Sequence, residues 1–266
     1  LVSGGVIPLG PVQLAVAALL VLVAGGVSVA FRLGIGGRLW VAALRTVVQL
    51  GLLGLVLERV FALDSPVLVV LLVAIMTLFA AREAVTRTGR NYRGIRIDSW
   101  LVMAGTCLVV GGVVTQAVIG VRPWYDPQYV IPLFGMILGN SLNGISLSLD
   151  RFLDYLSSRR VEVELQLAFG ASRREALATP LRAAVRTGMI PIINAMAAAG
   201  IVSLPGMMTG QILAGSPPLQ AVAYQIVVMF MIAAATAIGA MAAAIAAGRR
   251  LVAPDGALRL DRLRDR

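Results

Sequence analysis

The chain is 266 residues long, with 59% hydrophobic residues, 14% charged residues, a mean hydropathy of +0.89 and a formal net charge of +10. A soluble domain carries about twice that share of charged residues, so the composition predicts a membrane protein. All 23 basic residues are arginine, and the chain contains neither lysine nor histidine. The missing lysine excludes a P-loop, and the missing histidine excludes histidine zinc sites and Ser-His-Asp triads. We therefore expect no catalytic site and no bound cofactor in this chain, so energy for any transport must come from a partner or an ion gradient.

Seven stretches of the sequence are apolar and long enough to cross a bilayer, which takes about 20 residues per helix. They are 12–31, 39–61, 66–82, 99–121, 129–149, 187–204 and 219–247. The predicted fold is an all-α integral membrane protein with seven transmembrane helices. By topology it is a single polytopic membrane domain: five spans over 12–149, a cytoplasmic insert over 150–186, a two-helix hairpin over 187–248 and a charged tail over 249–266. We expect the tail to lie on the surface or to fray.

The arginines predict the orientation, with the N-terminus outside and the C-terminus inside. They gather in the segments 32–38 and 82–96, in the insert and in the tail, whereas only Arg59 and Arg122 fall near the other side. That asymmetry follows the positive-inside rule. Arginines on the inner side of the membrane face anionic lipid headgroups, so the net positive charge does not require nucleic acid as a partner. We therefore expect a multi-pass protein of the cell (inner or plasma) membrane.

The insert is the one long polar segment between spans, and its sequence predicts helix, turn and helix. A helical run from Val161 to Phe169 is followed by a break at Gly170-Ala171. Ser172 with Glu175 three residues later forms a capping box, which marks the start of a second helix. A helical insert on the arginine-rich side suits docking into a groove of a soluble partner.

Polar, proline, glycine and methionine residues within the spans, or directly after the sixth, are candidates for a translocation pathway or gate. They are Arg45, Gln49, Asn140, Asn143, Pro191, Asn194, Pro205, Gly206, Met207, Met208 and Gln211. Pro191 is expected to kink its helix, and Pro205-Gly206 to break it, which at membrane depth is tolerated beside a cavity. Arg45 could equally extend to the inner interface.

Met207 and Met208 could contact a passing metal ion through their sulfur atoms, or could simply fill space. No carboxylate lies in the middle of a span, which argues against a proton-coupled carrier. Two pairs of glycines, Gly135 with Gly139 and Gly206 with Gly210, are candidates for close helix contacts.

Four runs of the sequence carry a resemblance to a known family: ELQLAFGASRREAL, AAVRTGMIPIINAM, GIVSLPGMMTGQILAGSPP and YQIVVMFMI. They resemble the FetB-type permeases, the membrane subunits of iron-export ABC transporters, which are related to plant aluminium-tolerance permeases. The similarity extends from Arg45 to about Met241, and SLPGMMTGQI is its most specific part.

The resemblance implies a separate cytoplasmic ABC ATPase subunit that binds ATP and Mg, two copies of each subunit, and export of iron. The insert would then be the coupling element. Glu164 and Gly170 match the spacing of the EAA-type loop of ABC importers, although the later Leu-Pro of that loop is absent. The residues assigned to ATPase contact by this resemblance are Glu162, Glu164, Gly170, Ala171, Ser172 and Arg173.

Two other functions remain open at this point. One is an ABC permease for a non-metal solute or a chelate, in which Met207 and Met208 would tolerate leucine. The other is a channel or carrier without a partner, in which Glu164→Arg would leave function intact.

Overall fold

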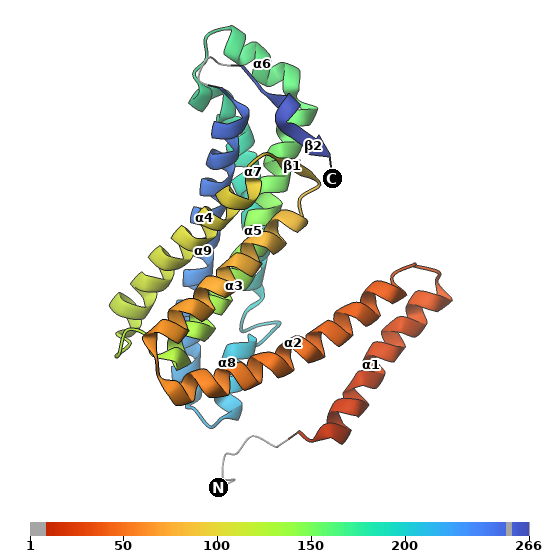
Figure 1. The fold of residues 1–266 in the computed structure, drawn as a ribbon, viewed down its shortest axis with the longest axis vertical. Coiled ribbons are helices and arrows are strands. Elements are labelled where there is room, and N and C mark those ends of the chain that lie inside the picture. The colour runs from red at the N-terminus through yellow and green to blue at the C-terminus, as the bar shows by residue number, and fades with distance from the viewer. Residues whose placement is uncertain (1–8, 254–256, 266) are drawn as a thin grey trace. The chain divides into compact units, whose positions relative to one another are not determined.

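The computed structural model describes residues 9–253 and 257–265, and this part of the chain is almost entirely helical (Figure 1). Its helices and strands are α1 (Pro11–Ala30), α2 (Gly36–Leu63), α3 (Pro66–Thr86), β1 (Arg90–Tyr92), α4 (Ile95–Gly112), the π-helical η1 (Val113–Ile119), α5 (Pro127–Ser158), α6 (Arg160–Ala168), α7 (Arg173–Ala198), α8 (Gly206–Leu213), α9 (Pro218–Leu251), the 3₁₀ turn η2 (Leu260–Arg262) and β2 (Leu263–Asp265). The one departure from the all-α prediction among these elements is the antiparallel pair of β1 and β2.

Six helical segments of the described chain are long and apolar enough to cross a membrane: α1, α2, α3, α4 with η1, α5 and α9. They correspond to six of the seven predicted spans. The predicted span 187–204 is not among them. Its helix, α7, carries Arg182, Arg186 and Asn194, and it ends at Ala198. The break that the sequence placed at Pro205-Gly206 therefore begins earlier, directly after Ala198.

The described residues divide into two compact units. The first holds α1, α2 and Gln211–Ser216. In this unit α1 and α2 form a hairpin, in which Gly25 of α1 lies beside the Trp40 ring and Ser28 beside Gly36. The second unit begins at Ser65 and holds α3 to α7 and α9, and the candidate sites described below lie within it.

Close contact between α5, α7 and α9 organises the second unit. An added Cβ at Gly188 of α7 would lie 2.5 Å from the Gly144 carbonyl oxygen of α5. An added Cβ at Gly144 would lie 2.7 Å from the Gly188 carbonyl oxygen and would overlap the Thr236 side chain of α9. Small residues let helix backbones approach this closely in membranes. Of the two glycine pairs predicted for this role, Gly135 lies close to Met76 of α3, with 3.1 Å between an added Cβ and the Met76 methyl carbon, whereas Gly139, Gly206 and Gly210 face open space.

The charged end of the chain folds back onto the unit instead of fraying. Leu251 and Val252 are fully buried, and β2 pairs with β1 in the α3–α4 connection. One hydrophobic cluster joins this tail to the insert, since Val163 of α6 and Leu177 of α7 pack in the same core as Leu251. In Figure 1, α6 and the two strands lie at the same end of the bundle.

A buried carboxylate holds α4 to α9 at this end. The Arg250 guanidinium donates to both oxygens of Asp98, at 3.2 and 3.0 Å, and the Tyr92 hydroxyl donates to Asp98 at 3.1 Å. The Asp98 side chain is 10% exposed, whereas that of Arg250 is 51% exposed. Burial, followed by the charge of Asp98, raises the pKa of the Tyr92 phenol, so that it remains a donor.

We predict that Gly188→Ala lowers the free energy of unfolding by about 1–3 kcal/mol, because the added methyl group forces α5 and α7 apart. Gly139→Ala on α5 is the matched control and is expected to be neutral, because nothing lies near that position. Cys107, a buried free cysteine, allows thermal unfolding to be followed with a thiol-reactive dye. Equal melting temperatures for the two variants would contradict the proposed close contact.

We predict that Asp98→Asn lowers the free energy of unfolding by about 2 kcal/mol, since Arg250 loses its ionic partner but remains half exposed to water. Asp154→Asn removes a carboxylate that pairs with Arg90 at 2.9 Å and is 47% exposed, and it should cost less than about 1 kcal/mol. The same dye measurement compares them. A smaller loss for Asp98→Asn than for Asp154→Asn would refute this ranking.

Candidate functional site

The insert has the helix–turn–helix form that the sequence predicts. At the end of α6 the Gly170 N–H donates to the Leu167 carbonyl at 3.1 Å, and the Ala171 N–H donates to the Gln166 carbonyl at 3.0 Å. This paired arrangement ends a helix by turning one residue into the left-handed region, and Gly170 has φ +88°. Gly170, predicted as an ATPase contact, thus has a backbone role in the turn.

The predicted capping box then starts α7. The Glu175 N–H donates to the Ser172 hydroxyl at 3.4 Å, and the Ser172 N–H donates to the Glu175 carboxylate at 2.7 Å. Hydrogen bonds from the Ser172 side chain and backbone lower the pKa of Glu175, so that the carboxylate stays ionised at neutral pH. Two local devices therefore fix the turn between α6 and α7.

α6 is apolar on two opposite faces. One face is buried in the core of the second unit through Val163. The other carries Val161 and Leu165 and continues to Phe169, the C-cap residue directly after the helix. These side chains follow one another at intervals of four residues and are 67%, 50% and 86% exposed. Residues four apart lie on one side of a helix, so the three form a continuous stripe, which we call the docking face.

The sequence reasoning did not select these three residues. It favoured the charged residues of α6, and the structure shows that those make local pairs. Glu162 accepts from Arg159 at 3.2 Å and from the Tyr155 hydroxyl at 3.4 Å, and Glu164 accepts from Arg160 at 2.7 Å. Ala171 and Arg173 are partly buried in the turn and at the start of α7. The spacing of Val161, Leu165 and Phe169 was the signal that could have identified the docking face.

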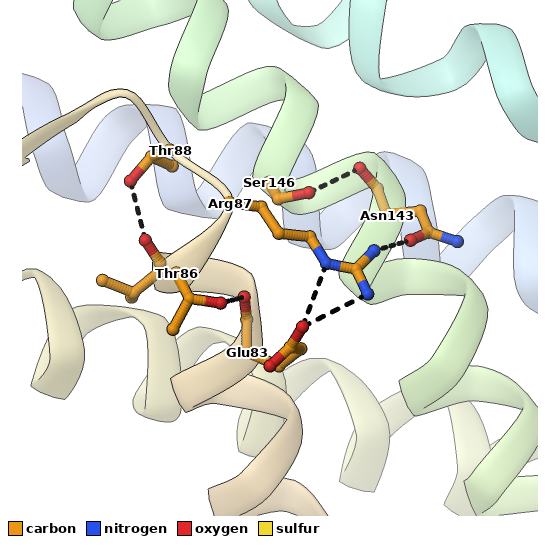
Figure 2. Close-up of polar contacts among 7 residues, drawn as sticks. Glu83, Thr86, Arg87, Thr88, Asn143 and Ser146 are labelled. Atoms are coloured by element: carbon orange, nitrogen blue, oxygen red, sulfur yellow. Dashed lines mark hydrogen bonds and ion pairs between the residues drawn. The ribbon is translucent and has the colours of Figure 1, made fainter. Parts of the chain in front are cut away.

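A second polar region lies along α5, where it meets α3 and α7. Figure 2 shows the Arg87 guanidinium pointing at Asn143, whose amide oxygen accepts a hydrogen bond from it. Arg87 also lies 3.5 Å from the Glu83 carboxylate, and the Ser146 hydroxyl donates to the Asn143 carbonyl at 3.0 Å.

Two cavities meet at this region. The larger is open, measures about 380 Å³, and is lined by Arg87, Asn143, Ser146, Leu147, Asp150 and Pro191. The smaller measures about 50 Å³ and is lined by Asn140, Asn143, Gly144, Gly188, Pro191, Ile192, Ala195 and Thr236. Both are lined by Asn143 and Pro191, so they lie next to each other, and we call the two together the polar track. The Thr236 hydroxyl oxygen is buried without a hydrogen-bond partner, although buried polar groups are normally paired.

The structure therefore brings together three predicted pathway residues, Asn140, Asn143 and Pro191. Asn194 is exposed on α7 and lines neither cavity.

Other predicted pathway residues lie elsewhere along the chain. Pro205 precedes α8, which contains Gly206, half-buried Met207, buried Met208 and Gln211. Arg45 and Gln49 are exposed on α2, in the first unit.

The polar track offers oxygen atoms from amide, hydroxyl and carboxylate groups. Asp150 contributes a carboxylate that also accepts from the Gly89 N–H at 2.7 Å. Oxygen ligands suit hard cations, whereas thioethers suit soft ones. Among the described residues there is no cluster of three histidine, cysteine or acidic side chains that could hold a resident metal ion.

Comparison with known proteins places the chain among membrane proteins. Residues 11–252 match the family described as "Uncharacterised protein family (UPF0014)". The chain is 41% identical over 200 residues to "UPF0014 membrane protein slr1647" of Synechocystis, covering 75% of this chain and 77% of the relative. No solved structure shows significant similarity to it.

Two further relatives have functional names. "Probable iron export permease protein FetB" of Escherichia coli is 32% identical over 222 residues, which is 83% of each chain. "Protein ALUMINUM SENSITIVE 3" of Arabidopsis thaliana is 31% identical over 228 residues, covering 85% of this chain and 82% of the relative. These matches agree with the resemblance that the sequence motifs indicated. The chain is a multi-pass membrane protein and belongs to the UPF0014 family.

Proposed function

We propose that this chain is the permease subunit of an ABC transporter that exports a metal ion, powered by a separate cytoplasmic ATPase that docks on α6. The observation that carries the proposal is the docking face, three large apolar side chains exposed along a short helix outside the spans and at its C-terminal cap. Burying a phenylalanine or leucine side chain contributes about 1.5–3 kcal/mol, so leaving three in water is unfavourable without a partner. A helix with an apolar stripe is a common ligand of grooves in soluble proteins.

The contacts that join α6 to the membrane helices support this assignment. α6 contacts both α5 and α7. Those two helices form the polar track and cross at Gly144 and Gly188. Movement of α6 by the ATPase would therefore change the opening of the track, as alternation between inward- and outward-open states requires.

The proposal includes a topology and an assembly. The N-terminus is outside and the C-terminus inside, and the second half of α7 makes the seventh crossing beside α5 and α9. Two copies of this chain assemble with two ATPase subunits, which bind ATP and Mg. The chain itself is a transport subunit and not an enzyme.

The cargo in this proposal is a hard metal ion such as Fe(III) or Al(III). The oxygen-rich polar track supports a hard ion, and the names of the E. coli and Arabidopsis relatives refer to iron and aluminium. Met207 and Met208 are the rival contact set, and they would favour a softer ion such as Cu(I).

Arg87 favours a second candidate cargo, an anionic metal chelate. A free cation would meet the positive guanidinium in the lining of the larger cavity, whereas a carboxylate-bearing chelate would pair with it. Transport of the citrate complex in preference to the free ion would support this second function.

We predict that Phe169→Ala weakens assembly with the ATPase subunit by about tenfold or more, since a buried aromatic anchor is lost. Phe230→Ala is the matched control, because Phe230 is also exposed, at 62%, but lies within the membrane-spanning part of α9. Co-purification and ATP hydrolysis in nanodiscs measure both effects. Assembly that is unchanged in Phe169→Ala would overturn the docking role of α6.

We predict that Asn143→Ala lowers metal-stimulated ATP hydrolysis and vesicle transport by roughly tenfold while assembly with the ATPase persists, because the track loses its central oxygen donor. The Met207→Leu/Met208→Leu variant should remain close to wild type. Fe(II), Fe(III), Mn(II) and Al(III) would each be supplied free and as citrate complexes. The reverse pattern, with loss only in the methionine variant, would assign metal contact to the thioethers.

A further inference from the structure

A third cavity lies at the arginine-rich end of the second unit and shares no lining residue with the polar track. It forms where α3 ends and α4 begins, and it measures about 550 Å³. Its lining is Arg82, Val85, Thr86, Asn91, Tyr92, Gly94, Ile95, Arg96 and Ile97. We propose that this cavity binds the phosphate headgroup of an anionic phospholipid in the inner leaflet.

The charge in the cavity is positive and uncompensated. The side chains of Arg82 and Arg96 have no hydrogen bond or ion pair with any other described residue, and no acidic residue is among those that line the cavity. The nearby carboxylates have other partners, because Glu83 contacts Arg87 and Asp98 contacts Arg250. Arg82, Arg96 and Asn91 line the same cavity, and arginine binds phosphate oxygens through parallel hydrogen bonds.

The position of the cavity selects a lipid rather than a soluble anion. One helical turn into the membrane from Arg82, α3 exposes Leu78 and Phe79, each 59% exposed. One turn into the membrane from Arg96, α4 carries the half-exposed Trp100. A ligand would therefore have its phosphate at the arginines and apolar chains along these side chains. Tryptophan is enriched at the same depth, where lipid headgroups meet acyl chains.

The orientation of the chain agrees with an anionic lipid. Under the positive-inside rule the arginine-rich end faces the cytoplasm, where anionic lipids attract basic residues of membrane proteins. Basic cavities between transmembrane helices on that side are typical binding sites for such headgroups. The walls of the cavity belong to α3, β1 and α4, and β1 is held by β2, so a bound lipid would also stabilise the α3–α4 connection.

The test is native mass spectrometry of the delipidated full chain with added phosphatidylglycerol or phosphatidylcholine. We expect wild type to retain phosphatidylglycerol in preference, and Arg82→Gln/Arg96→Gln to bind it roughly tenfold or more weakly. Arg174→Gln/Arg249→Gln is the control, since it removes the same charge from exposed positions outside the cavity and should bind like wild type. Equal binding by all three proteins would overturn the proposal.

A second measurement does not depend on the folding of the Arg82→Gln/Arg96→Gln variant. Trp100 would be kept as the sole tryptophan by changing Trp40 and Trp124 to phenylalanine, and its fluorescence read with brominated lipids. Brominated phosphatidylglycerol should quench it more strongly than brominated phosphatidylcholine. Equal quenching would contradict the proposal. Loss of the phosphatidylglycerol preference in the presence of millimolar-range inorganic phosphate would likewise contradict it, by assigning the site to a free anion.

Discussion

The close approach of α5 and α7 at Gly144 and Gly188 is the constraint on which the second unit depends. Each glycine lies against the carbonyl oxygen of the other helix, so no side chain fits at either position. The same two glycines line the smaller cavity, together with Thr236 of α9. The helix contact and the smaller cavity therefore have the same cause, the absence of side chains at Gly144 and Gly188. The two backbones touch at these glycines, and Asn140, Asn143 and Pro191 line the space next to the contact. In a bilayer, where apolar side chains gain little by leaving lipid, such backbone packing is a main source of helix association.

This crossing connects the two candidate sites mechanically. α5 continues without interruption from the polar track to Ser158, one residue before α6, and α7 runs from Arg173, just after the turn, to Pro191 at the track and beyond. Close-packed helices do not absorb a displacement by bending gradually. They shift as units between discrete packing arrangements, because protein interiors have little free space. A displacement of α6 is therefore expected to move α5 and α7 against each other at their glycine contact. The Asp98–Arg250 pair fixes α4 to α9 at the same end, which supplies a stable frame for that movement.

How much the sequence could predict depended on the range of the interactions. The turn between α6 and α7 was predicted nearly residue by residue, because Gly170 and the Ser172–Glu175 capping box act within a few residues. Six spans followed from local hydropathy. The contacts of Gly144 with Gly188 and of Asp98 with Arg250 join distant helices, so no local pattern revealed them. Of the glycines chosen by spacing, only Gly135 lies against a neighbouring helix within the described chain, beside Met76 of α3. The docking face was not predicted, because the sequence analysis assigned partner contact to the charged residues of α6. In the structure, Glu162 and Glu164 pair with the nearby Arg159 and Arg160.

The central claim, that α6 presents its exposed face to a cytoplasmic ATPase, is tested most directly by hydrogen–deuterium exchange of the permease in nanodiscs, with and without the ATPase subunit. The account predicts slower exchange across Val161–Ser172 on assembly, because the amides of α6 and its turn become covered and less able to open. Protection should be strongest around Phe169. Unchanged exchange in this segment, together with protection elsewhere, would contradict the account and assign the docking surface to another part of the chain.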